Sequence, residues 1–207
     1  MSNFSTDADL LPCEPNVFVD LPLTNQQTLK ITDAALDGVT VTSATGGFTA
    51  LVAGDVAVIS SSDADGAAFA IASIDDDHTI TLDRAPTHLA ATTGLTLAVR
   101  TFEPQRQQVH EQLMRCVGID PDGDELDESA IVSTGLMRRL EVLGTLWRAY
   151  NAAHALVGDN TAVEAKAAQY ARHFNRALAG AVVLIDTNGD GVADVQRTPG
   201  VGRLARA

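Results

Sequence analysis

Six short segments rich in β-branched residues follow one another between residues 30 and 100. Apolar and polar side chains roughly alternate within each segment, and glycine-rich or aspartate-rich turn signals separate them. Six short strands at this spacing predict a small β-barrel or sandwich, and about 70 residues is near the lower limit for a core that stands alone. The segments are TLKIT, VTVTSA, VAVISS, AFAIASI, HTITLD and LTLAVRT.

The pattern changes near residues 101–104, after which apolar residues recur every three or four positions, as expected for three helices. The first begins near Pro104, places Val109, Leu113, Cys116 and Val117 on one face and ends at Gly118. The second has the cleanest apolar face and begins at Ser129 or slightly earlier. Its stripe is Val132, Leu136, Leu140, Leu143, Trp147, Tyr150, His154 and Val157.

The third helix is expected to be capped by Asp159 or Asn160 and to end at Gly180. The short connection between the second and third helices predicts an antiparallel pair. The stripe of the third helix is Val163, Ala167, Tyr170, Phe174 and Leu178.

Two further segments flank these regions. Residues 1–29 contain Pro12, Pro15 and Pro22, which forbid a long helix, and NVFVDLPL predicts a short strand in an arm that packs on a later element. Residues 181–197 carry Asn-Gly and Asp-Gly turn signals, which predict a β-hairpin.

The expected fold class is therefore α+β: an α-helical bundle of three main helices with an N-terminal small β-barrel or sandwich insert, and a C-terminal β-hairpin followed by an extended tail. The expected boundaries are an N-terminal arm at 1–29, a small β domain at 30–101, the helical bundle at 102–180, the hairpin at 181–197 and the tail at 198–207.

The charge is strongly acidic. The chain has 27 acidic and 14 basic residues, a formal net charge of -13, which argues against nucleic acid or an anionic membrane as the main partner. No apolar run approaches the roughly 20 residues of a membrane span, and the N-terminus lacks the features of a signal peptide. Cys13 and Cys116 are expected to be reduced, partly buried thiols.

No catalytic constellation is apparent in the sequence, so an enzyme is not expected. There is no GxSxG, HExxH, P-loop or GxGxxG motif. A metal-assisted hydrolase using His78 or His88 with nearby carboxylates is the weakest alternative. His154 lies on an apolar stripe and is expected to be a hydrogen-bonded core or interface residue. The aspartates of the β region are expected to be solvated turn residues.

One motif has the spacing of a metal site. Asp186, Asn188, Asp190 and Asp194, with Gly191, match the first nine positions of a DxNxDGxxD calcium loop. Position 12, which should supply a bidentate carboxylate, is Arg197. Two interpretations stay open: a hairpin turn stabilised by Asx hydrogen bonds, which is simpler, or a Ca²⁺ site. No other cofactor is expected.

The C-terminal residues are locally basic. Arg203, Leu204 and Arg206 form an arginine–apolar–arginine strip, which is either a disordered end or a segment that orders against an acidic or apolar groove of a partner.

The N-terminal DLLPCEPNVFVD, the β-rich region, the helical region and the closing LIDTNGDGVADVQRTPGVGRLARA together resemble head–tail connector proteins of tailed bacteriophages, also called adaptor or head-completion proteins. The resemblance covers the leader and residues 104–207 best. The β region is a decoration that the plain helical adaptors lack.

The resemblance implies a structural virion protein of the neck, present in the host cytoplasm during assembly. Its copies would form a ring, usually twelvefold, between the portal protein and a tail-side neck or tail terminator protein. DNA would pass through the ring without specific binding. Arg203, Leu204 and Arg206 would contact the portal, and Arg138, Arg139 and Arg148 would meet acids on a neighbouring copy. The alternative is a calcium-dependent β-type binding module.

Overall fold

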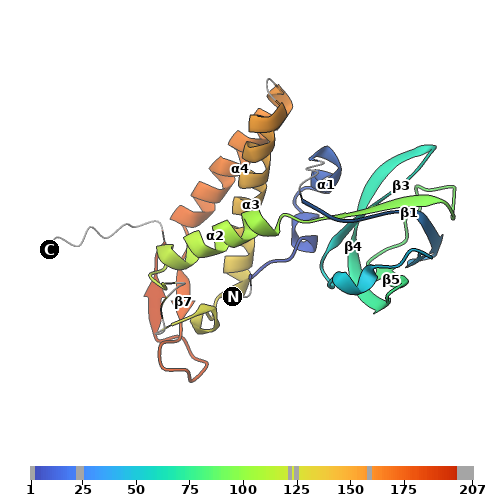
Figure 1. The fold of residues 1–207 in the computed structure, drawn as a ribbon. Coiled ribbons are helices and arrows are strands. Elements are labelled where there is room, and N and C mark those ends of the chain that lie inside the picture. The colour runs from blue at the N-terminus through green and yellow to red at the C-terminus, as the bar shows by residue number, and fades with distance from the viewer. Residues whose placement is uncertain (1–2, 22–25, 121–122, 124–125, 158–159, 200–207) are drawn as a thin grey trace. The chain divides into compact units, whose positions relative to one another are not determined.

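The computed structural model of the protein describes residues 3–21, 26–120, 123, 126–157 and 160–199. The chain divides into two compact units (Figure 1). One contains residues 6–103, and the other contains residues 1–5 together with 104–207. We call them the barrel unit and the helical unit and describe each by itself.

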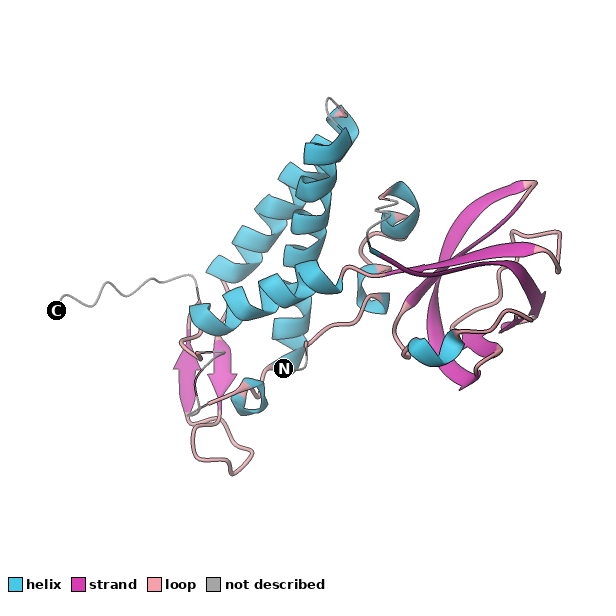
Figure 2. Ribbon diagram, in the orientation of Figure 1, coloured by secondary structure: helices cyan, strands magenta, loops and turns pink. Residues whose placement is uncertain are grey.

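The barrel unit is built on six antiparallel strands that close into a barrel in the order β1-β2-β5-β4-β3-β6 (Figure 2). The six strands predicted from the alternating pattern are confirmed, and they form a barrel rather than a sandwich. Their bounds are β1 Gln27–Asp37, β2 Thr40–Thr42, β3 Val56–Ser61, β4 Ala64–Asp76, β5 Thr79–Leu82 and β6 Leu95–Arg100.

Closure depends on two long strands that change partner along their length. The first half of β1 pairs with β6 and its last residues pair with β2, while β4 pairs with both β3 and β5. The pairing register shifts between Ile31 and Ala34 in β1 and between Ile71 and Ser73 in β4, and such bulges bend a strand enough to turn a barrel corner. The interior is aliphatic with two phenylalanines: Ile31, Ala34, Val41, Phe48, Leu51, Ala57, Ile59, Phe69, Ile71, Ile80, Leu82, Leu95, Leu97 and Val99.

The leader belongs to the barrel unit from Thr6 onward. The strand predicted at NVFVDLPL is wrong, because Val17–Asp20 is a short helix, α1, that contacts β3 and β4. Val17 and Phe18 are fully buried, and the Phe18 ring lies 4.9 Å from that of Phe102. Two successive apolar residues point to one side of a helix turn but to opposite sides of a strand, so burying both favours the helix.

The helical unit contains α2 Glu103–Cys116, α3 Thr134–Val157 and α4 Thr161–Ala179. The predicted cap at Asn160 is confirmed, since its side chain accepts hydrogen bonds from the N–H groups of Ala162 and Val163. Helices α3 and α4 are antiparallel neighbours, whereas α2 runs across them (Figure 1). Gly144 of α3 permits this crossing, because a Cβ there would lie 2.6 Å from Val109 Cγ1 and 3.0 Å from Phe174 Cε2.

The expected fold class is therefore wrong in its main statement, although the protein is α+β. The structure is a closed six-stranded antiparallel barrel with four α-helices, not a three-helix bundle that carries a small β insert. The barrel has its own closed core and incorporates most of the leader, and α2 crosses α3 at Gly144 instead of lying alongside it in a bundle. Helical periodicity reveals which face of a helix is buried but not the angle at which two helices cross.

The start of the second helix also differs from the prediction. Ser129 is not its N-cap; its N–H and hydroxyl donate to Asp127, which caps a 3-10 turn at Glu128–Ala130. The next residues pair with the C-terminal hairpin, because Ile131 bridges Ile185 and Val132 N–H donates to the Leu184 carbonyl. Helix α3 therefore begins only at Thr134, and Val132 is 42% exposed rather than part of a buried stripe.

The predicted hairpin is confirmed: β7 Val183–Ile185 pairs antiparallel with β8 Val195–Arg197. It closes the core of the helical unit. The buried members of this core are Val109, Leu113, Met114, Val117, Ile119, Ala130, Ile131, Met137, Leu140, Phe174, Ala181, Val183 and Ile185.

Candidate functional site

The loop between β7 and β8 holds the four residues of the predicted metal motif. The Asp186 carboxylate accepts hydrogen bonds from the N–H groups of Asn188, Gly189 and Gly191 at 3.1, 2.8 and 2.7 Å. These bonds, with that of Gly191 the largest, lower the pKa of Asp186 below its usual value. Gly189 and Gly191 have φ of 79° and 83°, a conformation that favours glycine.

The other motif residues also bond within the loop. Asn188 Oδ1 accepts from Asp190 N–H, Asp190 Oδ1 from Val192 N–H, and the Asp194 carboxylate from the N–H and hydroxyl of Thr187. Arg197, at position 12, turns away and donates from its guanidinium to the Val117 carbonyl. The geometry is that of an Asx-stabilised turn, and among the described residues no group of three or more His, Cys, Asp or Glu side chains is placed to hold a metal ion.

The predicted partner-binding residues Arg203, Leu204 and Arg206 lie outside the described residues. The described chain ends at Pro199, two residues after β8. Of the arginines expected to meet a neighbouring copy, Arg138 and Arg139 are exposed on α3, and Arg138 Nε donates to the Phe4 carbonyl at 3.1 Å.

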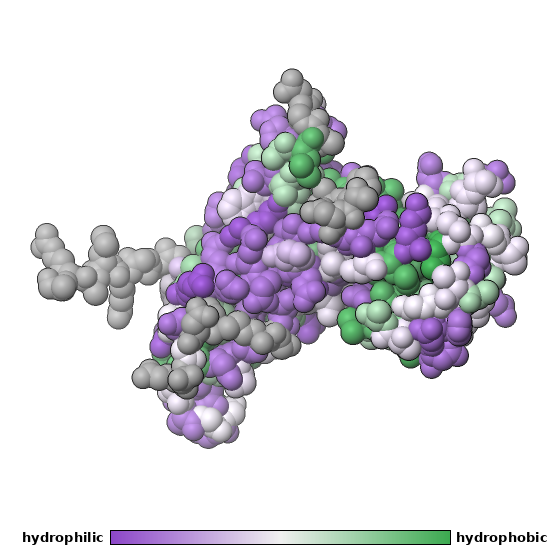
Figure 3. All heavy atoms as spheres, viewed as in Figure 1, coloured by the Kyte–Doolittle hydropathy of each residue, from purple (hydrophilic) through white to green (hydrophobic). Residues whose placement is uncertain are grey.

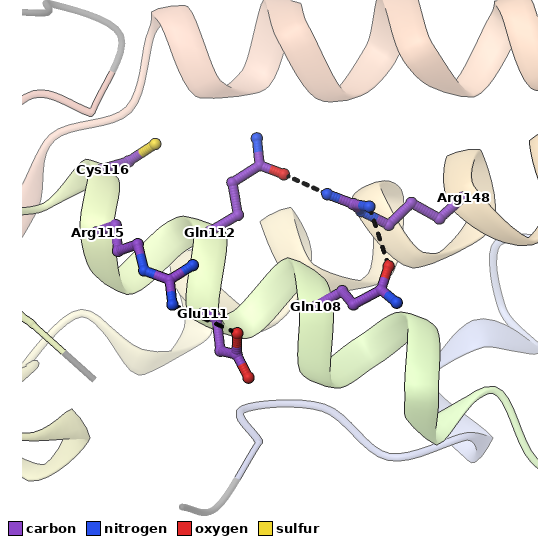
Figure 4. A pocket seen from close by; sticks show the side chains of 6 residues that line it. All are labelled: Gln108, Glu111, Gln112, Arg115, Cys116 and Arg148. Carbon is purple, nitrogen blue, oxygen red and sulfur yellow. Dashed lines mark hydrogen bonds and ion pairs between the residues drawn. The ribbon is translucent and has the colours of Figure 1, made fainter. Parts of the chain in front are cut away.

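An open polar groove of about 590 Å³ lies beside α2 (Figure 4). Five of its lining residues come from successive turns of α2, and Arg148 comes from α3. The face of the helical unit seen in Figure 3 is mainly hydrophilic. The lining residues are Gln108, Glu111, Gln112, Arg115, Cys116 and Arg148.

Arg148 is held in this groove by neutral groups. Its guanidinium donates to the side-chain oxygens of Gln108 at 3.1 Å and Gln112 at 2.8 Å, and it lies 5.9 Å from the centre of the Trp147 ring. Its Nε is buried without a hydrogen-bond partner among the described residues. No described carboxylate pairs with it, so its positive charge is not neutralised.

A second polar cluster is fully buried and was missed by sequence reasoning. His110 of α2 and Glu141 of α3 are both 0% exposed, with 3.3 Å between Nδ1 and Oε1. Ser5 N–H donates to Glu141 Oε2 at 2.6 Å, and the Phe4 ring lies 5.1 Å from the imidazole. Arg106 also donates to the Ser5 carbonyl, at 2.6 Å, so the N-terminal residues are fixed to the helical unit.

The histidines and cysteines singled out in the sequence differ in how they are placed. His154 is half-buried and its Nδ1 has no hydrogen-bond partner within the described ranges, so it is not the hydrogen-bonded core residue that was one of its two predicted roles. Cys116 is exposed instead of lying on the buried face of α2, and Cys13 is exposed too; partial burial raises the pKa of the Cys116 thiol. His78 Nδ1 lies 2.9 Å from the Ser43 carbonyl and supports a turn.

Two aspartates of the β region are not simply solvated turn residues, because their carboxylates accept hydrogen bonds from other parts of the barrel unit. Asp77 accepts from the Thr49 hydroxyl at 2.8 Å and from the N–H groups of Gly47 and Thr49, and the hydroxyl bond is the largest cause of its lowered pKa. Asp33 holds Ser43 and Thr45 in the same way. These two carboxylates fix the connection that follows β2.

Comparison with known proteins gives no relative: no family model, no curated protein and no solved structure matches this chain. Among the described residues, no helix is both long and apolar enough to cross a membrane.

Proposed function

We propose that the protein is an adaptor at the head–tail junction of a tailed bacteriophage, where a ring of copies joins the portal protein to the tail or neck and extends the DNA channel. The proposal rests on the resemblance of the leader and of residues 104–207 to head–tail connectors. In this role the protein carries out no reaction; its copies, the portal and a tail-side protein supply complementary surfaces.

The observation that best supports the proposal is how the closing hairpin is fixed to the helical unit. Strand β7 pairs with Ile131 through Ile185, and the Arg197 guanidinium of β8 donates to the Val117 carbonyl. The segment with Arg203, Leu204 and Arg206 begins directly after this anchored strand. A short segment that starts from a fixed point loses less conformational freedom on binding, which favours its use as a portal contact.

The charge distribution suits a protein that surrounds DNA without retaining it. Residues 1–100 hold 13 acidic and 3 basic residues, a net charge of -10, and residues 101–207 hold 14 and 11, a net charge of -3. An acidic wall repels the phosphate backbone, so DNA can move past it. The proposed location is accordingly the neck of the virion, reached by assembly in the host cytoplasm.

Co-sedimentation with the portal protein of the same phage tests this function. Four chains are compared: the full chain, a chain that ends at Thr198, an Arg203→Ala/Arg206→Ala variant and an Arg172→Ala/Arg176→Ala variant. The last pair removes the same charge from exposed positions of α4. We expect the full chain and the α4 variant to sediment with the portal and the other two to remain in the supernatant. Failure of the full chain to bind would refute the proposal.

A further inference from the structure

Arg148 is a positioned cation without an acidic partner among the described residues, as expected for a residue that pairs with another molecule. Two glutamine side chains hold its guanidinium within the groove without neutralising its charge. The nearest acid of the groove, Glu111, pairs instead with Arg115 at 3.6 Å. The groove is open to solvent and lined with polar groups along successive turns of α2 (Figure 4), so a carboxylate from outside can approach Arg148.

Acidic groups free to fill such a site occur on the barrel unit. Asp63 lies in the turn from β3 to β4, Asp65 is the second residue of β4 beside that turn, and both are exposed. Within the described ranges neither carboxylate takes part in a hydrogen bond or an ion pair. Asp33 and Asp77 differ, since their carboxylates are used to fix the connection after β2. The β3–β4 turn therefore presents two carboxylates that are not needed by the barrel itself.

We propose that the groove formed by Gln108, Gln112 and Arg148 binds the acidic β3–β4 turn of a second copy of this chain, with Asp63 or Asp65 paired to Arg148. The occupant follows from charge complementarity: residues 1–100 have a net charge of -10, and the groove presents an arginine that no described carboxylate neutralises. Because the groove and the turn are different surfaces, the contact is heterologous, and it generates a ring if the rotation closes.

This inference rests on the proposed function only in taking a second copy as the occupant. It deepens that function by naming the two surfaces at which neighbouring copies meet. It also predicts a salt-sensitive interface, because ion pairs formed at an open groove are screened by added salt.

A charge-exchange experiment on the full chain tests the pairing. One variant is Arg148→Glu and the other is Asp63→Lys/Asp65→Lys. In the first variant an acidic groove meets an acidic turn, and in the second a basic turn meets a basic groove. Like charges repel in both cases, so each variant alone should fail to self-associate. In an equal mixture the groove of either variant meets a complementary turn of the other. We expect the mixture to regain association, measured by sedimentation velocity at low salt with and without portal protein.

Two controls separate charge from folding. Arg148→Gln removes the charge and should weaken self-association about tenfold, and its own melting temperature shows whether the fold is kept. Arg172→Glu reverses an exposed charge on α4 and should leave association unchanged.

Three results would overturn the inference: no self-association of the wild-type chain with or without portal, wild-type association of Arg148→Glu, or a mixture that stays dissociated. Portal binding combined with either of the last two results would leave the proposed function standing, whereas a wild-type chain that never self-associates would also contradict the proposed ring. Charge-dependent self-association without portal binding would support the contact between copies and refute the proposed function.

Discussion

Glu141 shows how one buried side chain joins three segments of the helical unit. Its carboxylate lies 3.3 Å from His110 on α2 and accepts the N–H of Ser5 at 2.6 Å, and none of its surface is exposed. Replacing Glu141 removes the buried acceptor of the Ser5 N–H, and a buried polar group left without its partner costs about 1–3 kcal/mol.

We therefore expect Glu141→Ala to lower the free energy of unfolding by about 2 kcal/mol or more in urea denaturation followed by circular dichroism. The matched control is Glu111→Ala, which removes a partly exposed carboxylate that pairs with Arg115 one turn along α2 and accepts a hydrogen bond from Gln107. Its effect should stay below about 1 kcal/mol. Equal effects of the two substitutions would show that the buried pair adds nothing special.

Asp186 makes stability depend on pH in a definite direction. Three backbone N–H groups favour its ionised form, so its pKa in the folded protein lies below the usual value. A lowered folded pKa contributes stability that is complete above the unfolded pKa of about 3.9 and is lost as the pH falls through the folded pKa.

Melting temperatures of wild type and Asp186→Asn, measured from pH 7 to pH 2, test this sign. The wild type should be more stable by a constant margin down to about pH 4, and the margin should shrink below that. Asp63→Asn changes a turn carboxylate that has no partner in the part of the chain that the structure describes, and it should follow the wild-type curve throughout. A margin that grows on acidification would contradict the assignment.

The geometry of the β7–β8 loop favours an Asx-stabilised turn over a Ca²⁺ site. Its carboxylate and amide oxygens already accept backbone N–H groups, and position 12 is a cation whose guanidinium is committed to Val117. We expect the melting temperature to be the same in millimolar calcium and in chelator. A calcium-dependent rise, lost in Asp186→Asn, would favour the calcium-binding module instead.

The crossing of α2 over α3 and α4 depends on the missing side chain of Gly144. Gly144→Ala would force a methyl group to 2.6 Å from Val109 Cγ1, and such overpacking costs about 1–3 kcal/mol. Gly135, in the first turn of α3, has open space around it, so Gly135→Ala should be neutral or stabilising by up to about 1 kcal/mol. Thermal unfolding of both variants measures the difference, and a stable Gly144→Ala protein would argue against a tight crossing.

The elements that could be predicted from the sequence are those with a strong local period. The six strands, the hairpin and the Asn160 cap follow from alternation, turn residues and side-chain capping, all of which act over a few residues. The late start of α3 could not be predicted in this way, because Ile131 pairs with Ile185 far along the chain. A non-local pairing of this kind overrides the local helical pattern.

The candidate site was harder to predict than the fold. The motif residues of the hairpin were identifiable from spacing, but the buried pair was not, because a lone Glu or His is usually exposed or half-buried. One signal was present: Glu141 lies between Leu140 and Val142 and aligns with Met137 and Thr145 at helical spacing. Arg148 was expected to meet a neighbour, but the two glutamines that hold it became visible only in the structure.

At the scale of the whole molecule, the barrel unit has the properties of an independent domain. It has its own buried core, and its two ends are joined by a hydrogen bond from Phe102 N–H to Asp7 Oδ1 at 3.0 Å. A fragment of residues 6–103 should therefore fold alone, with dispersed amide resonances and a cooperative melting transition. A fragment that stays unfolded would mean that the barrel needs the helical unit.

The charge of the whole chain connects the two proposals. A molecule with 27 acidic and 14 basic residues repels its own copies unless its few arginines are placed at the contacts. In the two proposals Arg148 meets a neighbouring copy, and Arg203 and Arg206 meet the portal. Assembly should therefore depend on these arginines far more than on the exposed arginines of α4.

The central claim is that copies of this chain form a ring on the portal. Electron microscopy of the purified portal, imaged with and without the full chain, tests it most directly. The account predicts an added ring of density coaxial with the portal, continuous with its channel and absent when the chain ends at Thr198. Scattered single copies on the outside of the portal, or a portal unchanged by the protein, would contradict it.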